Sequence, residues 1–345
     1  MRYRTLGRTG VKVSTLCLGA MMFGAFGNPD HDECLAIIDA ALDAGINFID
    51  TADVYSRGES EEIVGRALQG KRETVVLATK ANGRMAEDRN AQGNGRRWLV
   101  QECENSLRRL GTDYIDLYQM HRPDPSCDID GTLGALSDLV RAGKIRYAGC
   151  STFPAYHIVE AQWASERRGL ERFVCEQPPY SILVRGIEAD VLPTCQRYRM
   201  GVIPWSPLAG GWLTGRYRKG REIAPSHRSQ RIPQRFDLSL PANQAKLDAA
   251  DALAAVAGDA GLGLIQLALG FVLAHPAVTS AIIGPRTMEQ LKGQLDGGDV
   301  VLGDDVLDRI DEIVPPGVTL NPADRGWVPP ALERPWERRR PPGAR

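Results

Sequence analysis

Short apolar runs alternate with amphipathic stretches along most of this 345-residue chain. The apolar runs are rich in β-branched residues and end at glycine or polar residues, which is typical of buried strands. We expect eight strands, at residues 16–20, 47–52, 75–81, 114–121, 145–151, 173–177, 201–207 and 279–285. Apolar residues with helical spacing predict helices at residues 32–44, 60–68, 97–110, 132–142, 155–168, 188–198 and 262–274, and one from residue 288.

Eight strands that each precede a helix predict a parallel sheet with right-handed crossovers, and this number fits a closed (β/α)8 TIM barrel. An open, doubly wound sheet is the alternative, but no G-x-G-x-x-G sequence follows the first strand. Residues 2–6 and 11–14 flank a GRTG turn and predict an N-terminal hairpin that forms a lid or plug. We expect the barrel to occupy residues 1–314, followed by a Pro/Arg-rich tail, residues 315–345, that is disordered over about its last dozen residues.

Polar side chains stand at the ends of three predicted strands. Asp50 ends the second strand, Lys80 lies near the end of the third, and His121 ends the fourth. Tyr55 follows Asp50 by five residues. The C-terminal ends of barrel strands face one mouth, so we expect these four residues to converge there. A tyrosine needs a cationic neighbour to donate a proton at neutral pH, and Lys80 is suited to that task. The alternative is that each of these residues has a structural role.

Two long loops interrupt the regular pattern, at residues 81–96 and 209–243. Both follow predicted strands and therefore lie at the same mouth. The second is far longer than a usual connection, and long loops in compact domains often serve a function. It carries seven cations, at Arg216, Arg218, Lys219, Arg221, Arg228, Arg231 and Arg235, against two acidic residues, at Glu222 and Asp237. A solvated surface loop is the alternative interpretation.

The composition excludes several classes of partner. A formal net charge of −1 and the lack of a Lys/Arg stripe between aromatic residues argue against nucleic acid. No apolar stretch reaches the roughly 20 residues that a membrane span needs, and no signal sequence is evident, so we expect a cytoplasmic protein. The seven cysteines are scattered and form no CxxC pair, which argues against disulfides and against a metal site.

The motifs around these residues resemble the aldo-keto reductases, especially the branch with potassium-channel β subunits and bacterial aldehyde reductases. The resemblance runs from about Tyr3 to Val314 and rests on GINFIDTADVYSRGESEEIVGRAL, VVLATK, SLRRLGTDYIDLYQMHRPD, IRYAGCS and WSPLAGGWLTGRY. It implies reduction of aldehydes or ketones with hydride from NADPH. By this likeness Tyr55 is the general acid, Lys80 its partner, Asp50 the partner of Lys80, and His121 the residue that orients the carbonyl.

The resemblance also implies where NADP(H) binds. Ser151, Thr152 and Gln177 would hold the carboxamide, and Trp205 would lie against the nicotinamide. By the same resemblance, the pyrophosphate would meet Ser206, Pro207, Leu208, Ala209 and Gly210, and backbone amides and small side chains suit that task. Cations of the long loop, Arg216 and Arg228, would clamp phosphates. Residues after the last strand complete the set: Gly284, Arg286 and Gln290 near the adenosine 2′-phosphate, and Gln294 at the adenine.

Departures from the family pattern limit what the resemblance implies. Thr152 stands where asparagine or arginine is usual, and Gly293 with Gln294 replaces a common Glu-Asn pair, so we expect looser adenine binding. A hydrophobic or aromatic aldehyde is the expected small-molecule partner, and a sugar-derived or polyketide carbonyl is the alternative. The pocket wall would be drawn from Met21, Met22, Phe23, Phe26, Trp98 and Trp327, and the alternative for each of these is a role in core or surface packing. A cofactor-sensing regulatory subunit with slow or no turnover is the alternative function. The sequence defines no oligomeric state.

Overall fold

Eight parallel strands form one curled sheet in the computed structural model, which describes residues 1–223 and 227–341. The strands are β3 (Leu16–Gly19), β4 (Phe48–Asp50), β5 (Val76–Ala81), β6 (Ile115–Met120), β7 (Ile145–Ser151), β8 (Phe173–Gln177), β9 (Gly201–Val202) and β10 (Ala281–Ile283). Their order is β10-β3-β4-β5-β6-β7-β8-β9. The edges β9 and β10 meet where Thr279 N donates to Val202 O (2.8 Å) and Ile282 N donates to Pro204 O (2.9 Å). The predicted (β/α)8 barrel is therefore confirmed.

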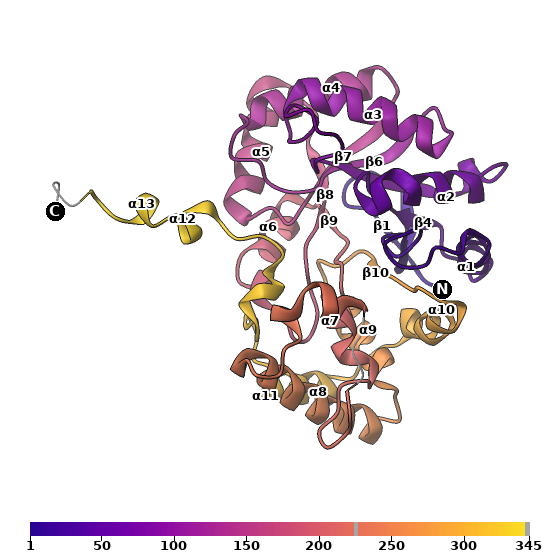
Figure 1. Ribbon diagram of the computed structural model, residues 1–345, viewed down its shortest axis with the longest axis vertical. Coiled ribbons are helices and arrows are strands. Elements are labelled where there is room, and N and C mark those ends of the chain that lie inside the picture. The colour runs from indigo at the N-terminus through magenta and orange to yellow at the C-terminus, as the bar shows by residue number, and fades with distance from the viewer. Residues whose placement is uncertain (224–226, 342–345) are drawn as a thin grey trace.

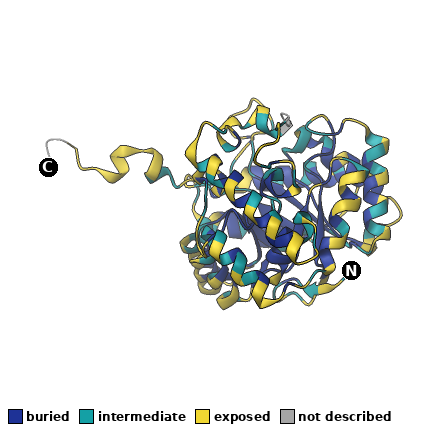
Figure 2. Cartoon of the chain, turned by 90° about the horizontal axis from the view of Figure 1, so that it is seen from below, coloured by how far each residue is buried: buried dark blue, intermediate teal, exposed yellow. Residues whose placement is uncertain are grey.

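Helices follow the strands and surround the barrel (Figure 1). These are α1 (His31–Asp43), α2 (Glu59–Ala67), α3 (Arg96–Leu110), α4 (Ile129–Arg141), α5 (Ala155–Arg168), α6 (Val191–Tyr198), α9 (Leu264–Ala274) and α10 (Met288–Leu295). Their apolar faces pack on the strands, while their outer faces are exposed (Figure 2). The expected helices start and end within three residues of these bounds.

The N-terminal hairpin closes the bottom of the barrel. Strands β1 (Tyr3–Thr5) and β2 (Lys12–Ser14) pair antiparallel. Leu6, in the turn between them, is fully buried against interior residues that include Phe48 and Cys175. A Cβ at Gly7, whose φ is +52°, would lie 2.6 Å from Val174 O, so only glycine allows this approach. The hairpin is thus a plug at the end opposite the strand termini that carry Asp50 and His121.

Two helices of ten residues or more in the structure were not predicted from the sequence. Helix α8 (Pro241–Asp259) extends the long loop after β9, and α11 (Asp304–Ile313) packs against it. Alanines fill both faces of α8, which hides the helical spacing of its apolar residues. The loop before it contains η4 (Ala209–Thr214), α7 (His227–Arg231) and η5 (Pro233–Arg235). Residues 224–226 of this loop lie outside the described residues.

The C-terminal segment has two parts. Residues 318–325 pack on the barrel, where Arg185 N donates to Val318 O (2.9 Å) and Leu320 N donates to Leu183 O (3.1 Å). This part includes η7 (Pro322–Arg325). Beyond it, α12 (Pro330–Glu333) and α13 (Pro335–Arg338) run away from the body (Figures 1 and 2). The expected disorder of the last dozen residues stays a prediction, and residues 342–345 lie outside the described residues.

Helix lengths and cysteine positions bear on two expectations from the sequence, that no helix spans a membrane and that the cysteines form no metal site. Over residues 1–223 and 227–341 no single helix is long and apolar enough to cross a membrane, and only α8 and α9 together reach that length, as a pair bent by 92°. Six of the seven free cysteines are buried. Within the same ranges, no group of three or more His, Cys, Asp or Glu residues could hold a metal ion.

Candidate active site

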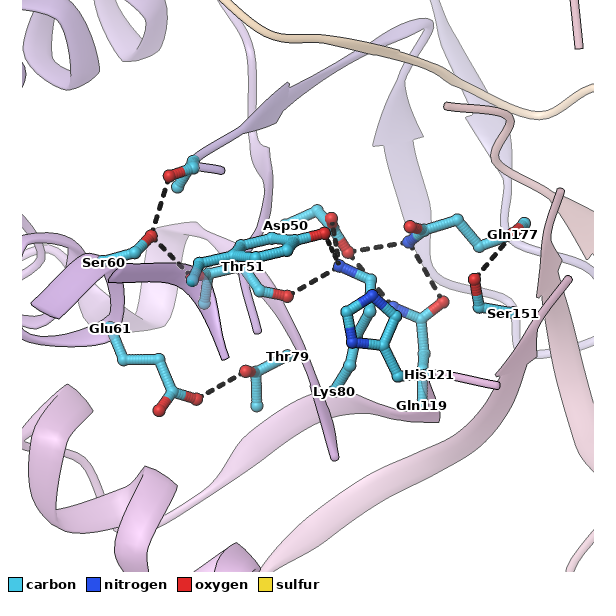
Figure 3. Close-up of polar contacts among 12 residues, drawn as sticks. Asp50, Thr51, Ser60, Glu61, Thr79, Lys80, Gln119, His121, Ser151 and Gln177 are labelled. Atoms are coloured by element: carbon cyan, nitrogen blue, oxygen red, sulfur yellow. Dashed lines mark hydrogen bonds and ion pairs between the residues drawn. The ribbon is translucent and has the colours of Figure 1, made fainter. Parts of the chain in front are cut away.

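Three adjacent strands bring the four expected residues together at the mouth of the barrel. Asp50 ends β4, Lys80 lies one residue before the end of β5, and His121 directly follows β6. Because these strands are parallel neighbours, their C-terminal ends meet at one edge. Tyr55 reaches the same point from the short helix η1 (Tyr55–Gly58). Figure 3 shows Asp50, Lys80 and His121 gathered there.

Lys80 is the centre of this network. Its Nζ donates to Asp50 Oδ2 (2.6 Å), to the Thr51 carbonyl oxygen (2.8 Å) and to the Tyr55 hydroxyl (3.3 Å). The side chain is fully buried and that of Asp50 nearly so. Burial lowers the pKa of Lys80, but the charges and hydrogen bonds of Asp50 and Tyr55 outweigh it and hold this pKa above its ordinary value. Lys80 is therefore a fixed ammonium group beside the Tyr55 hydroxyl.

The second oxygen of Asp50 is held by two amides. Asp50 Oδ1 accepts from Gln177 Nε2 (2.8 Å) and from Gln119 Nε2 (3.1 Å). Gln177, expected at a cofactor carboxamide, thus directs its side-chain nitrogen to Asp50. This leaves the side-chain oxygen of Gln177, Oε1, for a ligand. Gln119 was missed from the sequence. It lies two residues before His121 on β6, and the two-residue period of a strand places both on one face.

A left-handed turn fixes Tyr55. Ser56, Arg57 and Gly58 have φ values of 49°, 57° and 97°. Such values cost free energy for residues other than glycine and persist only where the surroundings enforce them. Here the Ser56 hydroxyl donates to the Phe23 carbonyl (2.9 Å) and accepts from Phe26 N (3.0 Å). The turn therefore joins Tyr55 to the loop after β3.

His121 lies beside the Tyr55 ring as a neutral imidazole. The two rings meet edge to face, with centroids 5.7 Å apart. Burial, together with the charges of Arg122 and Lys80, holds the pKa of His121 well below its usual range. At neutral pH the ring therefore offers one N–H donor and one acceptor beside the Tyr55 hydroxyl.

The expected carboxamide and pyrophosphate residues follow β7, β8 and β9 and contain further strained positions. Thr152 and Ser206 have φ values of 61°, and Ala209 has 50°. The Ser151 hydroxyl donates to the backbone carbonyl oxygen of Gln177 (2.8 Å), and this bond ties the end of β7 to the end of β8. Strain of this kind gathers at ligand sites because the fold must hold the backbone in one conformation there.

Glu176 supports this strained backbone from behind and was missed from the sequence. Its Oε1 accepts from Phe153 N (3.1 Å), one residue after Thr152, while its Oε2 is buried without a partner among the described residues. Burial raises the pKa of Glu176 to about 7, although the Cys150 thiol and backbone N–H groups oppose this. Glu176 lies inside strand β8, and nothing in the sequence indicates that its side chain faces the surrounding helices.

The basic loop separates into paired and unpaired cations. Arg218 pairs with Asp251 and Lys219 with Asp248, each at 2.8 Å, and Arg235 pairs with Asp324. Arg231 lies over the ring of Phe26, 3.7 Å from its centroid. Among the described residues no carboxylate pairs with the remaining three, Arg216, Arg221 and Arg228. Two of these, Arg216 and Arg228, are the residues expected to meet phosphates.

The backbone near Arg228 has the features that a phosphate-bearing nucleotide needs. Arg228 Nη1 would lie 3.7 Å from a Cβ at Gly210, so its guanidinium borders the expected pyrophosphate strip. A Cβ at Gly211 or Gly284 would meet nothing within 4 Å, which marks open space beside both. Two buried polar atoms, Trp205 Nε1 and Gln294 Oε1, lack partners in the described chain. The donor set fits NADP(H).

Arg286 stands at the start of α10 with its backbone fixed. Its N–H donates to Gln290 Oε1 (2.8 Å), and its carbonyl accepts from Asn28 Nδ2 (2.8 Å). The Arg286 side chain is exposed. Gln290 therefore orients the backbone of Arg286, while the guanidinium is free to meet an anionic group.

The residues expected to form a substrate wall differ in their surroundings. Phe23 is fully buried in the core, and Phe26 lies under Arg231. Trp98 borders a polar cavity of about 440 Å³ between the loops after β5 and β6. Trp327 lies with its ring centroid 6.2 Å from that of His157. A substrate wall formed by the expected residues therefore stays a prediction.

Comparison with known proteins gave consistent matches over the whole barrel. A family model described as the aldo/keto reductase family matches residues 15–315. An uncharacterized oxidoreductase, YrpG, of Bacillus subtilis (strain 168) is 40% identical over 339 residues, which cover 95% of this chain and 100% of that protein. A probable voltage-gated potassium channel subunit beta of Oryza sativa subsp. japonica is 35% identical over 91% of this chain and 97% of its own. The aldo-keto reductase YhdN of Bacillus subtilis (strain 168) is 34% identical over 85% and 87%.

Proposed function

The chain belongs to the aldo/keto reductase family, and on that premise we propose that it is an oxidoreductase that reduces aldehydes or ketones to alcohols with NADPH. The observation that carries the proposal is the contact of the Lys80 ammonium with both Asp50 (2.6 Å) and the Tyr55 hydroxyl (3.3 Å). An ammonium fixed next to a phenol stabilises the phenolate that proton donation leaves behind.

The residues of the chain divide the proton chemistry between them. Tyr55 donates its proton to the carbonyl oxygen as that oxygen becomes an alkoxide, and Lys80 stabilises the phenolate that results. Asp50, held by Gln119 and Gln177, keeps Lys80 charged. Neutral His121 donates a hydrogen bond to the same oxygen and so orients the substrate. NADPH, when bound, supplies the hydride that completes the two-electron reduction.

The donor set supports a place for this cofactor along the strand ends. Ser151, Thr152 and the carbonyl oxygen of Gln177 would hold the carboxamide, and Trp205 would border the nicotinamide. The open backbone at Gly211 and the cations without carboxylate partners, Arg216 and Arg228, suit the pyrophosphate. Arg286 would meet the 2′-phosphate, and Gln294 Oε1 would find a donor on the adenine amine.

The test is Tyr55→Phe, with Tyr118→Phe as the matched control. Tyr118 is buried in the barrel wall, whereas Tyr55 is half-buried, and the Tyr118 hydroxyl has no partner among the described residues. We expect Tyr55→Phe to lower kcat for an aromatic aldehyde by about 10²–10⁴-fold and to leave NADPH affinity, measured by tryptophan fluorescence, unchanged. Tyr118→Phe should keep full turnover. Equal turnover of wild type and Tyr55→Phe would refute the proton-donor role.

A second candidate function rests on the relatives named as potassium channel β subunits. By analogy, the chain would bind NADPH and report its redox state to a protein partner with slow or no turnover. A panel of aromatic aldehydes, aliphatic aldehydes, ketones and sugars separates the two candidates. Tight NADPH binding without oxidation of the cofactor by any of these carbonyls would favour the regulatory subunit over the reductase.

A further inference from the structure

The C-terminal segment 318–327, here called the strap, crosses the mouth of the barrel. It is fixed at its start by the backbone bonds from Val318 and Leu320 to the loop after β8. Asn321 and Asp324 are then buried, with 5% and 3% of their surfaces exposed. Asn321 Nδ2 donates to Asn243 Oδ1 (2.7 Å) at the start of α8. The strap is thus bound along its length, which the Pro/Arg-rich composition of residues 315–345 did not predict.

Asp324 of the strap pairs with a buried cation, Lys246, and with a half-buried one, Arg235. Its Oδ2 lies 2.9 Å from Lys246 Nζ, and its Oδ1 accepts from Arg235 Nε. Lys246 also donates to the Arg235 carbonyl (2.7 Å), and its side chain is only 1% exposed. Removing a partner from such a buried group leaves uncompensated charge, so this contact fixes Lys246 and Arg235 to the strap.

The same two cations hold the segment that borders the expected pyrophosphate strip. The Lys246 ammonium lies over the rings of Trp212 and Phe236, at 4.7 and 5.6 Å from their centroids. Trp212 Nε1 donates to the Arg235 carbonyl (3.3 Å). Trp212 follows Gly210 by two residues, and the Phe236 ring would lie 3.3 Å from a Cβ at Gly210. The position of Gly210 is therefore tied to Asp324 through two aromatic rings.

The far end of the strap touches the other part of the cofactor site. A Cβ at Gly326 would lie 2.7 Å from Trp205 Cζ2 and 3.1 Å from Thr152 Cγ2. Gly326 has a φ of +81°, and its lack of a side chain lets the strap backbone rest on the Trp205 ring. The strap thus contacts residues expected at both the nicotinamide and the pyrophosphate.

We propose that the strap is a positioning element of the cofactor site, in which Asp324 fixes the backbone around Gly210 and Gly326 fixes Trp205 and Thr152. This inference rests on the proposed function, because it assigns the strap a role in holding NADPH. Asp324 is a positioning residue, since it reaches Gly210 only through Lys246, Arg235 and the rings. Loss of the Asp324 carboxylate accelerates cofactor release, although no group that contacts the reacting atoms is removed.

The first test is Asp324→Asn, which keeps the shape of the side chain but removes its charge. Stopped-flow fluorescence of NADPH release should show a rate about tenfold faster or more, as expected when one member of a buried charged pair is neutralised. The control is Asp259→Asn, which breaks the exposed Arg309–Asp259 pair. Asp259 ends α8, the helix that also carries Lys246, the partner of Asp324. An unchanged release rate in folded Asp324→Asn protein would overturn the role of Asp324.

The second test uses two glycines of similar backbone conformation and needs no buried charge to be altered. Gly326 has a φ of +81° and Gly317 of +77°, but a Cβ at Gly317 would meet nothing within 4 Å. Gly326→Ala and Gly317→Ala therefore share the backbone cost, and only the former presses on Trp205. We expect a weaker NADPH affinity, by about tenfold, for Gly326→Ala alone.

The outcomes distinguish failure of the inference about the strap from failure of the proposed function on which that inference rests. Wild-type protein that fails to bind NADPH refutes the proposed function, and the strap's role in holding it falls as well. Wild-type protein that binds NADPH, with the two alanine variants equal in affinity, refutes the strap alone. Loss of affinity confined to Gly326→Ala supports both.

Discussion

Replacing Glu176 by glutamine should change how the stability of the protein depends on pH. Glu176 is fully buried behind the cofactor side of the barrel, where its Oε1 accepts from Phe153 N at 3.1 Å. Its other oxygen has no partner in the described chain. Glutamine keeps the acceptor for Phe153 and carries no charge at any pH, so the substitution isolates the cost of ionising this group.

The magnitude follows from the pKa of Glu176 in the folded and unfolded chain. Burial raises it to about 7, against 4.5 for an ordinary glutamate. Between these values the folded protein keeps a proton that the unfolded chain has released, so stability falls as the pH rises from 4.5 to 7. At about 1.4 kcal/mol for each tenfold change in the proton equilibrium, the full effect is about 3 kcal/mol.

The assay is urea unfolding of wild type and Glu176→Gln at pH 5 and pH 8. The variant should gain about 2.5 kcal/mol relative to wild type between the two pH values, since part of the full effect is already present at pH 5. Glu166→Gln, on the exposed face of α5, is the control and should show no such change. A stability difference between wild type and Glu176→Gln that is the same at pH 5 and pH 8 would refute the buried-carboxyl argument.

Three further substitutions probe other parts of the structure. Arg109 pairs with the buried Glu61 (2.6 Å) and Glu102 (2.5 Å). In urea unfolding, Arg109→Leu should therefore lower the free energy of unfolding by about 3–5 kcal/mol, and a loss below about 1 kcal/mol would contradict a strong contribution from this pairing. Tyr118→Phe removes a buried hydroxyl without a partner among the described residues and should raise stability by about 1 kcal/mol in the same assay; a clear loss would reveal an overlooked partner. Arg286→Ala should raise KM for NADPH about tenfold or more and leave KM for NADH unchanged, whereas equal increases would exclude a contact with the 2′-phosphate.

The sequence predicted the barrel well because each strand and helix carries its own periodic signal. Asp50, Lys80 and His121 could be brought together from the sequence because they share one position relative to the ends of parallel strands. Gln119 could have been found in the same way, by counting two residues back from His121. Helix α8 was missed because alanines hide its spacing.

Other features depend on contacts between distant parts of the chain and left no local signal. Glu176 looks like a polar residue in a strand until the packing of α5 shows that it is buried beneath Phe153. The sequence assigns residues 318–327 to a tail, since the whole segment 315–345 is rich in proline and arginine. Their burial depends on the Asp324 contacts with Lys246 and Arg235, which are 78 and 89 residues away.

Charge pairing, rather than net charge, accounts for how a chain of formal charge −1 could hold a polyanionic cofactor. Arg218, Lys219 and Arg235 of the basic loop are neutralised by carboxylates of α8 and the strap, so they serve the architecture. Arg216 and Arg228 keep their charge unpaired among the described residues, next to backbone with open space for a ligand. Local cations of this kind attract phosphates over the short distances that ionic strength permits, whatever the sum over the surface. The division of one basic segment into paired and unpaired cations therefore distinguishes its anchors from its candidate phosphate contacts, which a count of arginines cannot do.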